Sequence, residues 1–440
     1  MKKSVRQNAL EILLKMQRNN AYSNLALDAK LNETKEKNSD SAFLTALVYG
    51  TLERLITIDY NLSLYLKQPL KKLKPEVLWT LRLGTYQLIY MDKVPQSAAV
   101  NESVQLVKNN KSAFASGLVN AVLRNISKNG IKYPDTCDEV YNMSVRFSFP
   151  QWIVKLWMDS YGKETAYGML ECMAKKAPLY IRVNTLKCSA DELAEKLQAE
   201  NVEVKRVANV ENALELVNPG AVEKLQAYKD GLFHVQDLSS QLCCAALSPK
   251  AGERVLDMCA APGGKSFTLC EMMENEGELL SFDIYASRLS LIESGAKRLG
   301  IKNIKVAEND ASKFNEELEK ADKVLCDVPC SGLGIIRRKP EIRYKNPLDI
   351  DKLPSIQYDI LCSCAKYVKT GGKLLYSTCS VNPAENAEIC EKFLKEHKQF
   401  KAVEPLENLD NRYLSDKFLT LMPHLNGTDG FFIATFIRTE

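Results

Sequence analysis

The sequence has little that points to membranes or metals. No run of 18 or more apolar residues occurs, so no membrane-spanning helix is predicted. The basic, amphipathic start lacks the apolar core and cleavage site of a signal peptide, which favours a cytoplasmic location. Only three histidines are present, and the 13 cysteines form no Cys-x-x-Cys pair, so no metal site is expected. In a reducing compartment most of these thiols are expected to be small buried residues.

Acidic side chains are scarce in the first third of the chain. Residues 1–140 hold 20 Lys and Arg against 13 Asp and Glu, a balance of +7, whereas the rest of the chain has a balance of −3. A basic front end suits contact with a polyanion such as nucleic acid. A solvated helical surface explains the same excess equally well, so charge alone decides nothing.

The apolar pattern predicts three parts of different fold class. Through residues 1–130 apolar positions recur at helical spacing without strand-like alternation, which predicts an all-helical domain over 1–135. Residues 131–145 are expected to form a connector. Between 145 and 236, helices give way to short strands around a helix at 190–200, typical of a small α+β module of the split βαβ kind. The predicted strands of this module are 178–184, 202–207, 213–217 and 232–236.

Residues 237–440 alternate short apolar runs with helical segments. This order predicts βαβ units around a largely parallel sheet, the Rossmann-like α/β class. The final apolar run, 430–436, is expected to join the same sheet. The other predicted strands are 254–257, 279–283, 303–307, 323–327 and 373–377.

Two common nucleotide motifs are missing from the first turn of this α/β domain. Residues 254–266 read as an apolar strand, a turn of small residues and a helix start, which lets a ligand approach the backbone closely. A P-loop requires glycine where Cys259 stands, and Gly-x-Gly-x-x-Gly is absent, so ATP and NAD do not fit. S-adenosylmethionine fits better, because its ribose needs an acid after the second strand and Asp283 is there. Asp310, after the third strand, is expected near the adenine, although each acid alone also suits a helix cap.

Two cysteines stand directly after predicted strands of the same sheet. They are Cys330, in Asp-Val-Pro-Cys-Ser-Gly-Leu-Gly, and Cys379, in Tyr-Ser-Thr-Cys-Ser-Val-Asn-Pro. Ligands of open α/β sheets bind at the carboxyl ends of the strands, so both thiols are expected to face the cofactor's methyl group. Cys326, inside its strand, is expected to be a packed residue.

Such thiols suit methylation of cytosine at carbon 5. That carbon becomes nucleophilic only after a thiolate has added to carbon 6, and the thiolate leaves again later. The turn into Pro383 is expected to lower the thiol pKa through its backbone N–H groups. Asp327 is expected to hold the N3 and N4 edge of the pyrimidine, and a second thiol near carbon 5 to assist proton removal.

Taken together, these segments resemble the motifs of the RNA 5-methylcytosine methyltransferases, the Nol/Nop/Sun family. The resemblance implies that Cys379 is the nucleophile and that Cys330 assists elimination, whereas DNA cytosine methyltransferases use their Pro-Cys thiol as nucleophile. It implies Asp327 as a third catalytic residue and S-adenosylmethionine as cofactor. The cofactor-binding residues it implies are Cys259, Ala260, Ala261, Pro262, Gly263, Gly264, Lys265, Asp283, Arg288, Asp310 and Asp327.

The resemblance extends along nearly the whole chain. The helical front end resembles the antitermination factor NusB, and the segments 149–154 and 233–240 resemble the middle of bacterial small-subunit rRNA enzymes of this family. This implies an RNA-binding role for the first two domains. It also implies a monomer without metal or membrane that acts on 16S rRNA, either free or in early assembly, with cytosine 967 as the expected target.

Three consecutive basic residues follow the first of the two cysteine motifs. Arg337, Arg338 and Lys339 follow the Cys330 loop and are expected to contact RNA phosphates, although a solvated loop has the same composition.

One alternative function is the same chemistry on tRNA or another rRNA. The other is a non-catalytic RNA-binding or antitermination-type factor, which the NusB-like front end suggests and the two motif cysteines oppose.

Overall fold

The chain folds into two compact units. The computed structural model describes residues 3–19, 38–110, 112–208, 210–406, 414–415 and 417–440. The helical unit consists of residues 1–174 together with 339–344, and the sheet-containing unit of residues 175–338 and 345–440. Among the described residues no single helix is long and apolar enough to cross a membrane, although the bent pair Asp40–Glu53 and Leu55–Ser63 meets that test jointly.

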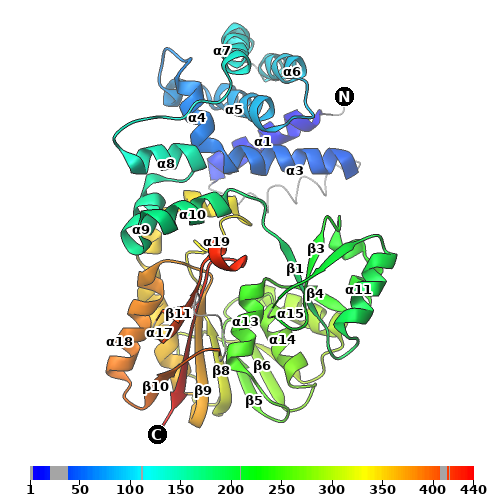
Figure 1. The fold of residues 1–440 in the computed structure, drawn as a ribbon, viewed down its shortest axis with the longest axis vertical. Helices are drawn as coiled ribbons and strands as arrows, with labels where there is room; N and C mark the ends of the chain where they lie inside the picture. Colours follow the sequence, from blue (N-terminus) through cyan, green and yellow to red (C-terminus); the bar gives the residue numbers. More distant parts are fainter. Residues whose placement is uncertain (1–2, 20–37, 111, 209, 407–413, 416) are drawn as a thin grey trace. The chain divides into compact units, whose positions relative to one another are not determined.

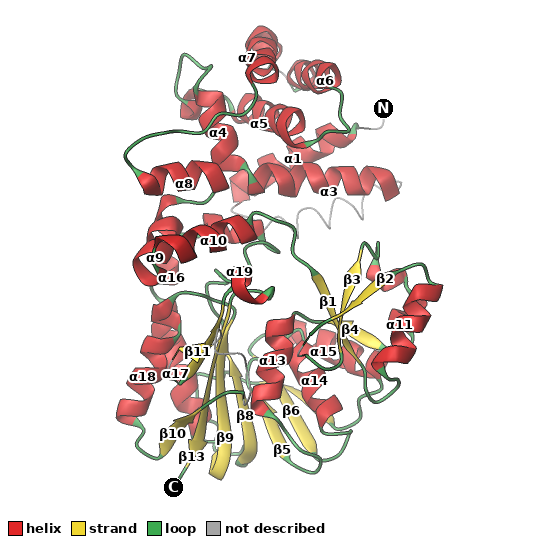
Figure 2. Ribbon diagram, in the orientation of Figure 1, coloured by secondary structure: helices red, strands yellow, loops and turns green. Residues whose placement is uncertain are grey.

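In the residues that the structure describes, the helical unit contains helices and short 3₁₀ turns and no strand (Figures 1 and 2), in agreement with the all-helical domain predicted over 1–135. Pro75 stands in the first turn of α5, where its missing N–H costs nothing. Leu13, Leu47 and Leu83 are fully buried between α1, α3 and α5. The elements are α1 (Val5–Asn19), α3 (Asn38–Glu53), α4 (Leu55–Ser63), η1 (Leu70–Lys72), α5 (Pro75–Tyr90), α6 (Gln96–Asn109), η2 (Ala113–Ala115), α7 (Ser116–Asn129), α8 (Glu139–Phe147), α9 (Gln151–Tyr161), α10 (Lys163–Met173) and η4 (Pro340–Tyr344).

The expected connector over 131–145 is wrong in its second half, where α8 begins. The Asp138 side chain caps this helix by accepting a hydrogen bond from the backbone N–H of Tyr141 at 2.9 Å. In its second half α8 buries Met143, Val145 and Phe147. The acidic residues Asp138 and Glu139 therefore stand at the start of a helix, where negative charge is favourable.

The short segment η4 belongs to the helical unit although it lies far along the sequence. Arg343, on this segment, is only 2% exposed. Its guanidinium donates hydrogen bonds to the carbonyl oxygens of Glu53 at 2.6 Å, Ser148 at 3.1 Å and Met173 at 3.5 Å. Burial lowers the pKa of Arg343 to about 10. The arginine thus caps backbone acceptors where α3, α8 and α10 end.

The smaller sheet confirms the predicted α+β module. It has four antiparallel strands in the order β2-β3-β1-β4, and α11 (Ala190–Ala199) packs on it through Leu193 and Leu197. Ser189 and Glu192 begin α11 with a capping box. The strands are β1 (Leu179–Val183), β2 (Glu203–Arg206), β3 (Ala213–Val217) and β4 (Phe233–Val235), followed by η3 (Val222–Lys224) and α12 (Gln226–Lys229) in the β3–β4 connection.

The larger sheet is parallel in its middle and antiparallel at one side. The strand order is β11-β12-β13-β9-β8-β5-β6-β7, with β10 also paired to β13, and the strands from β9 to β7 run parallel. Helices lie on the sheet in Figure 2 as expected for βαβ units. The strands are β5 (Arg254–Asp257), β6 (Glu278–Asp283), β7 (Ile304–Glu308), β8 (Ala321–Asp327), β9 (Val368–Thr378), β10 (Phe400–Val403), β11 (Leu414–Ser415), β12 (Phe418–Leu421) and β13 (Phe431–Arg438). The helices are α13 (Leu238–Leu247), α14 (Gly264–Met272), α15 (Ala286–Leu299), α16 (Pro347–Ile350), α17 (Leu353–Ala365), η5 (Pro383–Glu385), α18 (Ala387–Glu396) and α19 (Pro423–Asn426).

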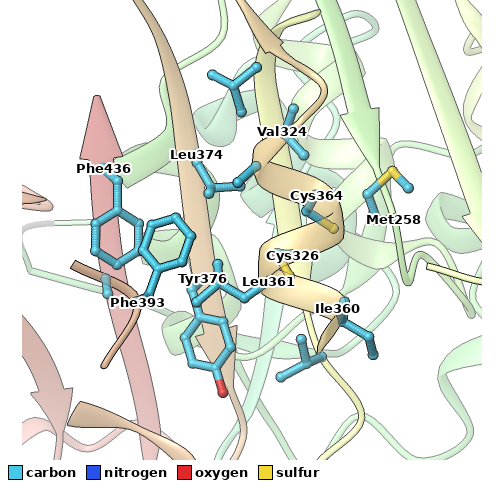
Figure 3. Packing of buried hydrophobic residues seen from close by; sticks show 14 of the residues in the cluster. Met258, Val324, Cys326, Ile360, Leu361, Cys364, Leu374, Tyr376, Phe393 and Phe436 are labelled. Carbon is cyan, nitrogen blue, oxygen red and sulfur yellow. The ribbon is translucent and has the colours of Figure 1, made fainter. Parts of the chain in front are cut away.

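A hydrophobic core fixes the strands that carry the two motif cysteines. Figure 3 shows Cys326 of β8 and Tyr376 of β9 beside Leu361 and Cys364 of α17. Cys326 is completely buried, which confirms its expected role as a packed residue. Because β8 and β9 are held in this core along their length, the loops that follow them emerge at one defined sheet edge.

Candidate active site

The site lies where the strand order of the large sheet changes direction. β5 pairs with β6 on one side and with β8 on the other. The chain first adds β6 and β7 on one side of β5 and then crosses back to add β8 and β9 on the other side. Ligands of open α/β sheets bind outside the carboxyl ends of the strands at such a switch point. Asp257 ends β5 and Asp327 ends β8, and Asp327 lies opposite Ser377 in the register of β9.

A cavity of about 180 Å³ opens at this switch point. Seven of the predicted site residues line it: Cys259, Ala260, Ala261, Pro262, Gly264, Lys265 and Asp327. Four residues that sequence reasoning did not assign to the site also line it: Val235, Gln236, Ser240 and Asp257. Gln236 donates to the carbonyl oxygen of Gly264 at 3.0 Å, which ties the segment after β4 to the start of α14.

The turn between β5 and α14 requires glycine at one position. Gly263 has φ of +106°, a region that residues with a Cβ rarely adopt. A Cβ at this position would stand 2.5 Å from Cζ of Phe267, one turn into α14. The small residues of this turn therefore bring the helix start close to the cavity, as the sequence predicted.

Gly263→Ala is expected to lower both stability and cofactor affinity. Backbone strain costs roughly 1–3 kcal/mol, and displacement of Phe267 moves the turn that lines the cavity. Gly252→Ala is the matched control, because Gly252 has φ of +82° but open space around its Cβ direction. Thermal unfolding and calorimetric titration with S-adenosylmethionine measure both effects. Equal cofactor affinity in the two variants would contradict a role of the turn in binding.

Asp257 is a buried carboxylate with one unused oxygen. Its Oδ2 accepts a hydrogen bond from Ser266 Oγ at 2.6 Å, and its Oδ1 has no partner among the described residues. Burial raises its pKa to about 7. A buried carboxylate oxygen without a donor is costly, so its place on the cavity wall suits a ligand that brings a donor, such as an ammonium group.

Lys265 and Asp327 form an ion pair across the cavity. Lys265 Nζ lies 2.8 Å from Asp327 Oδ2, and Ser377 Oγ donates to Asp327 Oδ1 at 2.7 Å. Burial alone disfavours the charged lysine, but the adjacent Asp327 outweighs it and the pKa of Lys265 is raised. Both carboxylate oxygens of Asp327 thus have fixed partners, which hold the side chain in one orientation.

The two motif cysteines lie in direct contact. Cys330 Sγ and Cys379 Sγ are 3.1 Å apart although the residues are 49 positions apart in sequence. A hydrogen bond from the Cys330 thiol lowers the pKa of Cys379, and burial opposes this effect. The pKa of Cys330 is raised by its hydrogen bond to Cys379 and by burial. The pair therefore consists of one thiol that ionises readily and one that keeps its proton.

The predicted source of the lowered cysteine pKa is wrong, although its direction is right. Backbone N–H groups of the turn at Pro383 were expected to stabilise the thiolate. In the structure the first N–H of that turn, from Ala384, is directed to the Asn382 side chain at 3.3 Å. The neighbouring cysteine is the donor that the thiolate uses instead.

Four predicted cofactor residues do not line the cavity: Gly263, in the turn described above, and Asp283, Arg288 and Asp310. Asp283 ends β6, is buried, and accepts a hydrogen bond from the N–H of Tyr285 at 3.0 Å. The Arg288 guanidinium lies 4.9 Å from the ring centre of Tyr285. Asp310 accepts from Ser312 Oγ at 2.6 Å, and this bond lowers the pKa of Asp310.

The expected phosphate contacts of Arg337 and Arg338 are wrong. Arg337 is buried and donates to Asp429 at 3.1 Å and to the carbonyl oxygen of Thr428 at 2.6 Å. Arg338 bonds both Asp429, at 2.5 Å, and Asp237, at 2.7 Å. These arginines fasten the loop after Cys330 to the turn before β13, so their charges are already neutralised. Lys339 is exposed, and its RNA contact stays a prediction.

The switch-point cavity, the small-residue turn and the mixed sheet define a Rossmann-like methyltransferase domain. Three family models match the chain: "16S rRNA methyltransferase RsmB/F" over residues 244–437, "NusB family" over 3–128, and "Methyltr_RsmF/B-like, ferredoxin-like domain" over 149–223. The probable ribosomal RNA small subunit methyltransferase B of Bacillus subtilis is 40% identical, covering 99% of this chain and 98% of its own. The chain therefore belongs to the family of ribosomal RNA small subunit methyltransferases B.

Other relatives agree over most of the chain. The ribosomal RNA small subunit methyltransferase B of Escherichia coli strain K12 is 32% identical over 82% of this chain and 84% of its own. The crystal structure of PH0851 matches with a TM-score of 0.82 and 27% identity over 100% of both chains. A methyltransferase homologue from Pyrococcus horikoshii matches with a TM-score of 0.61 and 30% identity over 69% of this chain and 100% of that one. These matches confirm the predicted family and the three-part fold.

Proposed function

We propose that this protein methylates carbon 5 of a cytosine in 16S rRNA, with cytosine 967 as the target, through a covalent adduct between Cys379 and carbon 6. Membership of the family makes the chain an rRNA methyltransferase that uses S-adenosylmethionine. The target carbon, the target cytosine and the covalent adduct are the proposal. The observation that carries the proposed adduct is the contact between Cys330 and Cys379, close enough to Asp327 for its charge to act on both thiols.

The chain's own residues divide the chemistry among them. The Cys379 thiolate adds to carbon 6 of cytosine, and the electron pair moves to carbon 5, which becomes nucleophilic. Asp327, fixed by Lys265 and Ser377, accepts a hydrogen bond from the N4 amino group of the ring, next to N3, where electron density increases during addition. Bound S-adenosylmethionine supplies the methyl group that carbon 5 receives.

Release of the product reverses the addition. The proton on carbon 5 is removed with the help of Cys330, the double bond between carbons 5 and 6 re-forms, and Cys379 leaves as a thiolate. The lowered pKa of Cys379 supports its part in this step, because a good leaving thiolate has a low pKa.

The residues around the cavity fit the proposed cofactor. The unused Oδ1 of Asp257 suits the ammonium group at the amino-acid end of S-adenosylmethionine, and Lys265 stands beside it on the wall. Asp283 is proposed to accept the ribose hydroxyls, and Asp310 to lie near the adenine. Gln236 is proposed as an additional contact, because it lines the cavity and bonds the start of α14.

The helical domain, predicted over 1–135, is proposed to bind the RNA. Four lysines within eight residues support this: Lys67, Lys71, Lys72 and Lys74 are all exposed, and none has an ion pair within the described part of the chain. Exposed lysines without ion pairs, gathered on one short segment, suit contact with phosphates. A similar role for the module over 145–236, a monomeric state, and a substrate that is free or early-assembly RNA in the cytoplasm remain predictions.

The rate of methyl transfer is expected to rise with pH, with a midpoint below pH 9. Only the ionised Cys379 adds to the ring, and its pKa lies below the ordinary value of 9.0. Activity is therefore lost as pH falls through this pKa and is fully present above it. Single-turnover rates with saturating RNA measure the profile. A rate that is independent of pH between 6 and 9 would contradict ionisation of a thiol as the activating event.

Incubation with labelled S-adenosylmethionine and 16S rRNA tests the proposed function. Transfer of label to the RNA, followed by bisulfite mapping, is expected to identify cytosine 967. Label on tRNA or 23S rRNA instead would support the same chemistry on another substrate. Tight binding of 16S rRNA without any transfer would support a non-catalytic RNA-binding factor.

A further inference from the structure

Glu385 has a buried carboxylate that no step of the proposed chemistry uses. It lies in the short turn η5, six residues after Cys379, and is 0% exposed. Its carboxylate accepts five hydrogen bonds and has no ion pair among the described residues. The donors are Ser331 N at 2.8 Å, Ser331 Oγ at 2.6 Å, Ser380 Oγ at 2.8 Å, Asn382 Nδ2 at 3.2 Å and Gln357 Nε2 at 3.0 Å.

The donors come from both cysteine loops. Ser331 directly follows Cys330, and Ser380 directly follows Cys379. The two serine hydroxyls also contact each other at 2.9 Å. A single carboxylate therefore joins, one residue away from each thiol, two loops that leave different strands. Gln357 adds a third attachment, from α17.

We propose that Glu385 is a positioning residue that holds Cys330 against Cys379. Its reach sets the distance between the two loops, and so the contact through which one thiol donates to the other. The inference rests on the proposed roles of the two thiols in methylation. A buried carboxylate is costly unless its donors are fixed, so the fivefold bonding makes this part of the site rigid.

The fold does not depend on this link alone. Gly334 N donates to the carbonyl oxygen of Cys379 at 3.0 Å, and Gly430 N donates to the carbonyl oxygen of Gly334 at 2.9 Å. Backbone bonds thus keep the two loops adjacent when the Glu385 carboxylate moves. A conservative change at Glu385 is expected to loosen the contact of the two thiols without unfolding the domain.

Two substitutions separate the reach of Glu385 from its charge. Glu385→Asp keeps the charge but shortens the side chain by one methylene, so it cannot bond both loops. Glu385→Gln removes the charge but keeps the length. Its amide oxygen still accepts from Ser331 N and Gln357, and its amide group can donate to the two serine hydroxyls, which are able to accept, so that of the five bonds only the one from Asn382 is lost.

The pKa of Cys379 distinguishes the two roles because they act in opposite directions. The groups that face this thiol are Cys330, Asp327, Lys265 and Glu385; the hydrogen bond from Cys330 lowers the pKa most, and the Glu385 charge raises it slightly. Loss of the Cys330 contact in Glu385→Asp therefore raises the pKa of Cys379. Loss of charge alone in Glu385→Gln leaves it unchanged or lowers it.

The experiment measures alkylation of Cys379 by iodoacetamide against pH, read by mass spectrometry of the full-length protein. Glu385→Asp is expected to move the alkylation profile to higher pH and to lower kcat for 16S rRNA roughly 10- to 100-fold, with unchanged affinity for S-adenosylmethionine. Glu388→Asp, at an exposed position three residues further on, is the matched control and is expected to change neither. Ser331→Ala, which removes only the hydroxyl bonds, is expected to shift the profile in the same direction by less.

An unshifted profile in both Glu385→Asp and Ser331→Ala would overturn the proposal, as would a larger effect of Glu385→Gln than of Glu385→Asp. Alkylation does not require methyl transfer, so the result is readable even where Cys379 is not the nucleophile. In that case the pKa shifts appear as expected while the variants methylate as the parent protein does. Thermal unfolding of each variant identifies any that fail to fold, and Ser331→Ala then decides.

Discussion

Cys379→Ala is expected to abolish methylation and covalent trapping together. Without the thiolate nothing adds to carbon 6, and carbon 5 stays too weak a nucleophile to take the methyl group. The loss in single-turnover rate is expected to exceed about 10⁴-fold, as for other enzymes that lose their nucleophile. RNA that contains 5-fluorocytosine traps the adduct of the parent protein, because fluorine on carbon 5 cannot leave as a proton does.

The site predicts that this loss is purely chemical. Cys379 is half-buried, and its backbone carbonyl, which accepts from Gly334, is retained in the variant. Affinity for S-adenosylmethionine and for RNA is therefore expected to stay unchanged in calorimetric titration. Cys137→Ala, which removes an exposed thiol, is the control and is expected to be fully active. Persistent trapping by Cys379→Ala would mean that another group is the nucleophile.

Cys330→Ala is expected to stall the reaction after methyl transfer. The adduct with ordinary cytosine RNA then accumulates and survives denaturing electrophoresis, and turnover falls roughly 10²- to 10⁴-fold, the usual contribution of an acid–base group. The Sγ atoms of the two cysteines are 3.1 Å apart, so the alanine also deprives Cys379 of its hydrogen-bond donor. The pKa of Cys379 therefore rises, and the adduct forms more slowly at neutral pH than at pH 9.

Cys330→Ser separates these two effects. The hydroxyl still donates to Cys379, so the pH dependence of adduct formation is expected to lie closer to that of the parent protein. Elimination stays slow, because serine is a much weaker acid than cysteine. An inactive Cys330→Ala protein that forms no adduct at any pH between 7 and 9 would show that the two cysteine roles are wrong or reversed.

The sequence predicted those parts of the fold that have a strong local pattern. The strands that became β5, β6 and β8 are buried apolar runs, and the turn after β5 has its small residues in one stretch. β10, β11 and β12 were missed because each has four residues or fewer and exists by pairing with β13 or with each other. Tertiary pairing decides such short strands, and no periodicity marks them.

The site shows the same division between local and distant contacts. Cys330, Cys379 and Asp327 stand in recognisable segments after strands, and their proximity followed from the sheet topology. The ion pairs of Arg337 with Asp429 span 92 residues, so a basic run that reads as an RNA contact is a structural clamp. Gln236 and Asp257 line the cavity and are bonded to α14, through Gly264 and Ser266. No local pattern marks them as site residues, although Gln236 lies in the segment 233–240 that resembled the family. Glu385 lies only six residues after Cys379 in the sequence, but only the fold shows that its carboxylate bonds both cysteine loops.

The most direct test of the account is to map the bond between protein and RNA. The full-length protein is incubated with S-adenosylmethionine and 16S rRNA fragments containing 5-fluorocytosine, digested, and analysed by mass spectrometry. The account predicts a single cross-linked peptide, attached through Cys379 to a methylated base at position 967. Attachment through Cys330, or methylated RNA without any cross-link, would contradict it.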